Sequence, residues 1–162
     1  MTSEGKENRA YKDVAGIVTI CYGHTGPDVK MGMVKTDAEC DALFISDVKK
    51  HQAPITTGHK ANCIGNVLLN YNQRDAVTSF IFNVGNGAFC ASTMARKLKA
   101  SDFEGAALEF PKWNKSTVNG KKVVLKGLVT RRANEQALFR SLEPWYPYGT
   151  EFNELKQLVV TK

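Results

Sequence analysis

The sequence predicts an α+β fold that is predominantly helical, in which a small N-terminal β lobe and a larger helical lobe enclose a cleft. Three observations lead to this prediction. β-branched residues and glycines gather before residue 35, apolar residues recur at helical spacing in several later segments, and one Asn-Gly pair marks a further hairpin. A length of 162 residues suits one domain over 1–162, with the β lobe at about 14–35 and the helical lobe at about 36–162.

The composition is that of a folded globular protein with a basic surface. Hydrophobic residues make up 43% and charged residues 23%, and the formal net charge is +6. This charge favours a polyanionic partner such as nucleic acid, an anionic cell envelope or an acidic polymer. Because the Lys and Arg residues are dispersed along the chain, we expect no nucleic-acid partner. No apolar run approaches the roughly 20 residues of a membrane span, and the N-terminus has no signal-peptide pattern.

The β lobe is predicted from two short segments. The stretch up to Lys12 is polar, whereas GIVTICYGHTG at 16–26 combines β-branched residues with turn-forming glycines. VKMGMV at 29–34 then supplies a returning strand. Together these segments predict a small antiparallel sheet.

Two helices follow. TDAECDALFISDVKKH at 36–51 opens with Thr36 and has Glu39 three residues later, which is the pattern of a capping box. QRDAVTSFIFNVGNG at 73–87 has apolar residues at helical spacing and ends at Gly85 and Gly87, so we expect a buried central helix. Gly85-Asn86-Gly87 therefore reads as a helix terminus and not as a phosphate loop.

The second half of the chain alternates helices with one hairpin. Ser101 and Glu104 form a second capping-box pattern that opens a helix closing before Pro111. Asn119-Gly120 predicts a tight hairpin. A further helix follows in LVTRRANEQALFRSL, and its apolar side is predicted to hold Leu128, Val129, Ala133, Ala137 and Leu138. In the tail 143–162, aromatic residues are expected to pack on the body before a short last helix.

The cysteines and histidines allow several arrangements. Cys21, Cys40, Cys63 and Cys90 are either buried thiols or two disulfides, and three full pairings remain open. His59 and Cys63 have the i, i+4 spacing of metal ligands, yet no second paired motif accompanies them, so we expect no metal. Ser46-Asp47-Val48-Lys49 matches a Ser-x-x-Lys motif by chance and reads as a solvated helix face.

Two carboxylates near the N-terminus are better candidates for chemistry. Glycoside cleavage requires one carboxylic acid that protonates the leaving oxygen and a second carboxylate across the sugar. Glu4 and Asp13 are nine positions apart and flank a chain reversal, which places two such groups across a cleft. The alternative is that both are ordinary surface acids.

The motifs in this region form a recognisable order. They are Glu4-Gly5, Ala10-Tyr11-Lys12-Asp13, Gly16, Thr19-Ile20 and Gly23-His24-Thr25-Gly26. This order resembles the catalytic signature of the T4-type phage lysozymes, the endolysins of glycoside hydrolase family 24. The resemblance extends over about residues 3–142, and it implies a lysozyme-like fold.

The resemblance also implies an activity and roles for individual residues. The reaction would be hydrolysis, with inversion, of the β-1,4 bond between N-acetylmuramic acid and N-acetylglucosamine in peptidoglycan. Glu4 would be the general acid, Asp13 would activate water or stabilise the cationic sugar, and the Thr19 hydroxyl would hold that water. No cofactor is implied, and we expect a monomer.

Other residues are similar to groove-lining or supporting positions of the family. The groove-lining candidates for substrate binding are Phe82, Asn83, Ser92 and Trp113. One of Arg131 and Arg132 is similar to the family arginine that approaches the catalytic glutamate, and the sequence does not distinguish them.

The front of the chain departs from the family pattern, in which a helix precedes the glutamate. Only three residues precede Glu4 here, and the CYGHTG and ECDAL motifs resemble the branch whose N-terminal signal anchor holds the enzyme in the inner membrane before release. We therefore expect a shortened form of a longer endolysin, made in the host cytoplasm and acting in the periplasm. Two further readings are a lytic transglycosylase and a catalytically inactive peptidoglycan-binding module.

Overall fold

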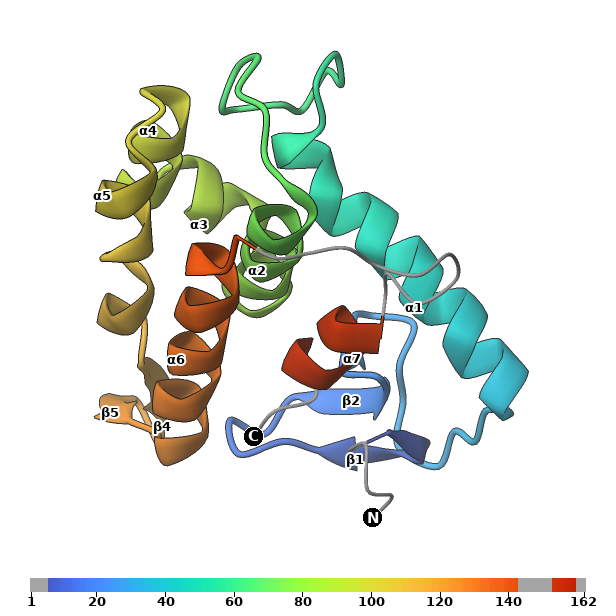
Figure 1. Ribbon diagram of the computed structural model, residues 1–162. Coiled ribbons are helices and arrows are strands. Elements are labelled where there is room, and N and C mark those ends of the chain that lie inside the picture. The colour runs from blue at the N-terminus through green and yellow to red at the C-terminus, as the bar shows by residue number, and fades with distance from the viewer. Residues whose placement is uncertain (1–5, 143–152, 160–162) are drawn as a thin grey trace.

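The computed structural model describes residues 6–142 and 153–159. Its elements, in chain order, are β1 (Glu7–Lys12), β2 (Val18–Cys21), β3 (His24–Thr25), α1 (Asp37–Gln52), η1 (Ala53–Ile55), α2 (Tyr71–Val84), α3 (Asn86–Cys90), α4 (Thr93–Lys99), α5 (Phe103–Ala107), η2 (Phe110–Lys112), β4 (Lys115–Val118), β5 (Lys121–Val124), α6 (Lys126–Arg140) and α7 (Asn153–Val159). The sheet formed by β1–β3 lies near one end of α1, and α3–α6 lie on the far side of α2 from it (Figure 1). A predominantly helical α+β architecture is thus confirmed.

The β lobe begins earlier than the predicted 14–35. The polar stretch before the predicted lobe forms β1 and pairs antiparallel with β2, with Tyr11 opposite Thr19. Ala10 is the one buried residue of this strand, and its other side chains are half-buried or exposed. One buried apolar residue and the backbone pairing with β2 are therefore enough to form the strand. The predicted returning strand at 29–34 is wrong. A turn from Lys30 to Met33 interrupts it, and a single bridge between Arg9 and Val34 remains.

The helices α1 and α2 each begin with a capping box. Thr36 and Glu39 form the predicted capping box of α1. α2 starts two residues before the predicted Gln73, because Asn70 accepts from the Gln73 N–H and Gln73 reaches back to the Asn70 N–H. α2 ends at Gly85, whose φ of 92° favours glycine. The apolar face of α2 is the centre of the core, as predicted.

The start of α5 differs from the expected capping box. Ser101 has a φ of 60° and ends the preceding turn, so its side chain is not the cap. Asp102 takes that role and accepts a hydrogen bond from the Gly105 N–H at 2.9 Å. α5 ends at Ala107, and Pro111 lies in the separate turn η2.

The hairpin predicted at Asn119-Gly120 is confirmed. β4 and β5 pair antiparallel with Val118 opposite Lys121. Both turn residues have positive φ, 50° and 80°, which is the geometry of a two-residue type I′ connection.

The buried face of α6 is not the predicted apolar one. Val129, Ala133 and Ala137 are exposed, whereas Leu128 and Leu138 are half-buried and Leu138 packs against the core as predicted. The buried side chains of this helix are Arg131, Arg132, Glu135 and Phe139. Both arginines pair with Glu135 within the helix, and Ser79 of α2 and the Val159 carbonyl of α7 supply the further partners that allow burial, which an apolar periodicity does not reveal.

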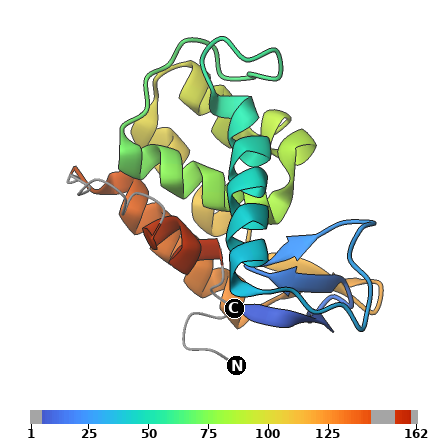
Figure 2. The same cartoon turned by 90° about the vertical axis from the view of Figure 1, so that its right-hand side faces the viewer.

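The last helix, α7, packs in the space between α6, α2 and the β lobe (Figures 1 and 2). Leu155 and Val159 are buried in a cluster with Phe44 and Val48 of α1, and Tyr22 and Phe82 pack against the same cluster. A short last helix is therefore confirmed, while the aromatic residues of the tail before it lie outside the described residues. Among the described helices, none is long and apolar enough to cross a membrane.

Two disulfides settle the cysteine pairing that the sequence left open. Cys21 of β2 is bonded to Cys40 of α1, and Cys63 is bonded to Cys90 of α3. The first ties the β lobe to the helical lobe. The second ties the loop between α1 and α2 to the helical core.

Candidate active-site cleft

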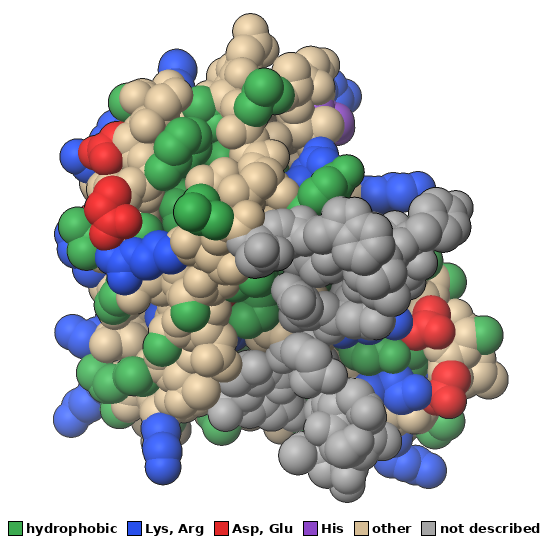
Figure 3. Space-filling view, viewed as in Figure 1, with side chains coloured by type: hydrophobic (Ala, Val, Ile, Leu, Met, Phe, Trp, Pro, Cys, Tyr) green, Lys and Arg blue, Asp and Glu red, His purple; other side chains and the backbone are tan. Residues whose placement is uncertain are grey.

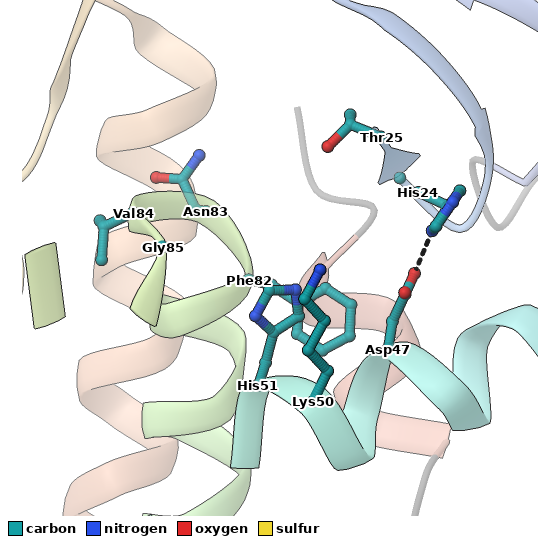
Figure 4. Close-up of a pocket in the computed structure, with 10 residues that line it drawn as sticks. His24, Thr25, Asp47, Lys50, His51, Phe82, Asn83, Val84 and Gly85 are labelled. Atoms are coloured by element: carbon teal, nitrogen blue, oxygen red, sulfur yellow. Dashed lines mark hydrogen bonds and ion pairs between the residues drawn. The ribbon is translucent and has the colours of Figure 1, made fainter. Parts of the chain in front are cut away.

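A cavity of about 240 Å³ lies between the β lobe and the helical lobe (Figure 4). Residues 23–25 of the β2–β3 hairpin form one wall. Asp47, Lys50 and His51 of α1 form a second wall, and residues 82–85 at the end of α2 form the third. Three elements distant in sequence thus meet where a cleft was predicted.

Asp13 opens the tight turn that joins β1 to β2. Its Oδ1 accepts hydrogen bonds from the backbone N–H groups of Ala15 at 2.8 Å and Ile17 at 2.9 Å. These two bonds hold the half-buried carboxylate in one orientation, and its Oδ2 has no hydrogen bond within residues 6–142 and 153–159. Asp13 is therefore a fixed carboxylate with one oxygen left for another group.

Thr19 lies on the sheet face that borders the cavity. It is directly opposite Thr25, a cavity-lining residue, and residues opposite each other in antiparallel strands share a face. Tyr11 of β1 is opposite Thr19 on the other side, and Asp13 follows the end of β1, in the turn that leads to β2. The Thr19 side chain is 4% exposed, and its hydroxyl donates to the Ile17 carbonyl at 2.9 Å.

Glu4, the predicted general acid, lies outside the described residues.

Of the four predicted groove residues, two line the cavity. Phe82 stacks on Phe44 with ring centroids 5.9 Å apart, and Asn83 accepts a hydrogen bond from Arg132 Nη1 at 2.9 Å. The other two lie elsewhere. Ser92 is the buried N-cap of α4, where it accepts from the Ala95 N–H. Trp113 packs edge-on against Phe80, with centroids 5.4 Å apart.

A buried ionic cluster stands behind Asn83. Glu135 is completely buried and lies 2.6 Å from Arg132 Nε and 3.2 Å from Arg131 Nε, and the Ser79 hydroxyl donates to it. Burial lowers the pKa of Arg131 to about 10, which leaves its guanidinium protonated at neutral pH. Arg131 and Arg132 thus both belong to one cluster, and only Arg132 reaches a cavity-lining side chain.

The cavity also contains residues that the sequence analysis did not assign to a site. His24 Nδ1 lies 2.7 Å from Asp47, as the dashed line in Figure 4 marks, and its Nε2 lies 2.9 Å from Asp28. Since a carboxylate only accepts hydrogen bonds, both ring nitrogens donate and the ring is an imidazolium. The hydrogen bond to Asp47 accordingly raises the pKa of His24.

The segment Ser46–Lys49 is not the solvated face that we expected. Asp47 and Val48 are buried, and only Ser46 and Lys49 are exposed. The sequence did contain a signal for this buried face, because positions 44, 47, 48 and 51 follow the i, i+3, i+4, i+7 spacing of one helix face. That spacing places Asp47 and His51 on the same side of α1 as Phe44.

His59 and Cys63 are the two residues whose spacing is that of metal ligands. His59 is in a loop, where its Nδ1 accepts from the Ala61 N–H, and Cys63 is in a disulfide. Among the residues that the structure describes, no group of three His, Cys, Asp or Glu side chains is arranged to hold a metal ion.

Comparison with known proteins gives consistent matches. The phage lysozyme family model matches residues 1–135. An endolysin of Acyrthosiphon pisum secondary endosymbiont phage 1 is 41% identical over 138 residues, covering 85% of this chain and 90% of that protein. A SAR-endolysin of Bacteriophage PS119 is 40% identical over 133 residues, covering 82% of this chain and 74% of the relative.

The solved structures agree with these sequence matches. The endolysin from Escherichia coli O157:H7 phage FAHEc1 has a TM-score of 0.71 and 33% identity, and the match covers 90% of this chain and 95% of that one. The shared architecture is a lysozyme-like fold. The helix α7 lies beyond the residues that the family model matches, yet its buried side chains belong to a cluster against which the cavity-lining Phe82 packs.

Proposed function

The chain belongs to the phage lysozyme family of peptidoglycan-lytic endolysins, and from this premise we propose that it is a muramidase. The bond cleaved is the β-1,4 linkage between N-acetylmuramic acid and N-acetylglucosamine. The observation that supports the proposal is the cavity between the lobes, lined by Thr25, which pairs with Thr19, with the Asp13 carboxylate held in the turn of the same sheet.

The proposed chemistry divides between two carboxylates. Glu4 protonates the leaving glycosidic oxygen, and Asp13 directs the attacking water or stabilises the positive charge on the sugar. The hydrogen bonds to Asp13 Oδ1 support this role, because they orient the carboxylate and leave Oδ2 for water or sugar. Thr19 supplies a hydroxyl oxygen that helps to position the water.

Substrate binding is proposed at two of the predicted groove residues. Phe82 offers an apolar surface for a sugar ring, and Asn83 offers an amide whose orientation is fixed by Arg132. Ser92 and Trp113 are left out of this proposal because their side chains are used for a helix cap and for core packing.

The place of action is proposed from the relatives. Endolysins act on the cell wall, and the SAR-endolysin relatives support a mechanism in which the enzyme reaches the periplasm by release from the membrane. We further propose that the protein acts as a monomer. The single-domain organisation over 1–162 is also a proposal.

The test is digestion of purified Gram-negative peptidoglycan, followed by mass measurement of the fragments. Glu4→Gln and Asp13→Asn are compared with the parent, and Glu7→Gln is the matched control because Glu7 lies in β1 outside the cavity. Asp13→Asn retains an oxygen that can accept the two turn hydrogen bonds, so we expect this variant to keep the fold.

The fragments distinguish the outcomes. Hydrated muropeptides with a reducing sugar, lost in both test variants and kept in the control, would establish the muramidase. Anhydro sugars would mean a transglycosylase, and protein that sediments with the wall without releasing fragments would mean a binding module.

A further inference from the structure

Two residues of the cavity wall have no part in the chemistry proposed above. Lys50 and His51 are adjacent in the last turn of α1, and both line the cavity. Figure 4 shows the ends of the two side chains directed to the same space, toward Asn83 and Thr25. Their polar groups therefore face whatever occupies the cavity next to the proposed catalytic face.

The hydrogen-bond network determines which nitrogen of His51 carries the proton. Asn86 Nδ2 donates to the backbone carbonyl of Lys50 at 3.0 Å, which turns the Asn86 Oδ1 toward the His51 ring. This oxygen lies 2.8 Å from His51 Nδ1 and only accepts hydrogen bonds, so Nδ1 is the protonated nitrogen.

The second ring nitrogen of His51 is consequently an acceptor. Burial lowers the pKa of His51, so the ring is neutral at pH 7 and Nε2 carries a lone pair. The Phe82 ring, with its centroid 4.6 Å away, holds the imidazole from one side. Nε2 forms no hydrogen bond with any residue of the described ranges.

Lys50 supplies a positive charge beside this acceptor. The nearest acid in the wall, Asp47, is already paired with the His24 imidazolium at 2.7 Å. Lys50 itself forms no ion pair within the part of the chain that the structure describes, and its side chain is exposed. The wall therefore presents an ammonium donor next to a neutral lone pair.

This combination selects a ligand that carries a carboxylate and, close to it, an N–H donor. A plain polymer of N-acetylglucosamine has no carboxylate. The muramic acid of peptidoglycan carries a lactyl-linked peptide stem, which has both amide N–H groups and free carboxylates. We propose that Lys50 and His51 recognise this peptide stem, the ammonium pairing with a stem carboxylate and Nε2 accepting from a stem amide.

This inference rests on the proposed function and adds a substrate preference to it. The preference is measured as kcat/KM on glycan strands that bear stems, divided by kcat/KM on strands from which an amidase has removed them. Lys50→Ala is compared with Lys49→Ala, which removes the same charge one position away at an exposed site outside the cavity. His51→Phe, which keeps a ring against Phe82, is compared with His59→Phe.

Lys50→Ala is expected to lower the ratio about fivefold, the size of an exposed ion pair, and Lys49→Ala to leave it unchanged. His51→Phe is expected to lower the ratio to a similar extent. A parent protein that cleaves both kinds of strand equally well would overturn the inference, as would equal ratios for Lys50→Ala and Lys49→Ala.

A binding experiment separates this inference from the muramidase proposal. N-acetylmuramyl-L-alanyl-D-glutamate is titrated into Asp13→Asn protein while the imidazole ¹⁵N resonances are recorded. We expect a proton on His51 Nδ1, a shift of Nε2 on binding, and weaker binding after Lys50→Ala. A proton on Nε2, or binding unaffected by Lys50→Ala, would contradict the inference. Binding through Lys50 in a protein that cleaves no strand would instead refute the muramidase alone.

Discussion

At the scale of single residues, the most informative side chain is His24, which joins two elements through its charge. It contacts Asp47 of α1 and Asp28 of the loop after β3. Its hydrogen bond to Asp47 raises the pKa of His24, and its hydrogen bond to Asp28 lowers the pKa of that carboxyl. Because the contact favours the protonated ring of His24 and the ionised carboxylate of Asp28, the stability of the fold depends on pH.

The two pKa shifts determine how stability changes with pH. The raised pKa of His24 stabilises the fold fully below the unfolded value near ~6.5, and this stability is lost as the pH rises through the folded pKa. The lowered pKa of Asp28 stabilises the fold above its unfolded value near ~4, and that part is lost on further acidification. We therefore expect urea-unfolding curves to show the parent weakening relative to His24→Gln as the pH rises from 6 to 10.

A second variant, at the carboxylate partner of His24, checks this prediction. Asp47→Asn removes the same interaction from the other side, so it is expected to flatten the alkaline part of the profile in the same way. An alkaline slope that survives in His24→Gln would show that another group carries the dependence.

Glu135 gives a second prediction at this scale. It is the common partner of two buried guanidinium groups, and Glu135→Ala leaves both of them without a counter-charge. Removing one partner of a buried ion pair costs roughly 3–5 kcal/mol of unfolding free energy. The exposed pair of Glu104 with Arg140 is the comparison, and Glu104→Ala is expected to cost less than about 1 kcal/mol. Equal losses measured by urea unfolding would contradict this account.

At the scale of elements, α7 stabilises the junction of the two lobes. Leu155 is fully buried among Phe44, Val48 and Val159, and Arg131 Nη1 donates to the Val159 carbonyl at 3.1 Å. Lys156 lies over the Tyr22 ring, 5.0 Å from its centroid. One short helix thus touches the β lobe, α1 and α6.

Leu155→Ala is expected to lower the unfolding free energy by about 2–5 kcal/mol, the usual cost of a leucine-sized cavity. Because Tyr22 and Phe82 pack against the same cluster, we also expect this variant to lose wall-digesting activity. Leu142→Ala is the control, since Leu142 is 92% exposed and its truncation should change stability by less than about 0.5 kcal/mol. An unchanged midpoint of thermal unfolding in Leu155→Ala would refute a structural role for α7.

The elements also show where local sequence signals suffice. The capping box of α1 and the type I′ turn at Asn119-Gly120 act within four residues, so they were predictable. β1 was missed because its stability comes from pairing with β2 and not from its own composition. The buried side of α6 was missed because Arg131 and Glu135 find their further partner, Ser79 of α2, only in the fold.

At the scale of the whole molecule, the net charge of +6 is spread out. Figure 3 shows Lys and Arg side chains distributed over the visible face without a single dense patch. Such a distribution attracts the protein to an anionic envelope in a way that salt screens.

We therefore expect the rate of lysis of envelope-permeabilised Gram-negative cells to fall as salt rises from about 50 to about 300 mM, because the screening length shortens across this range. Turbidity measures the lysis. Cleavage of a short, uncharged oligosaccharide serves as the control, and its rate should not change. A lysis rate that is flat in ionic strength would count against a role for the charge.

By itself, the sequence determined the fold class, most of the helices, the hairpin at Asn119-Gly120 and the family signature around Asp13 and Thr19. These properties depend on local spacing, which the chain carries in its order of residues. Only the tertiary structure decided the pairing of the cysteines and the position of α7 at the junction of the lobes. It also decided that Lys50 and His51 share a cavity with Asn83, because contacts between distant segments depend on which surfaces are buried together.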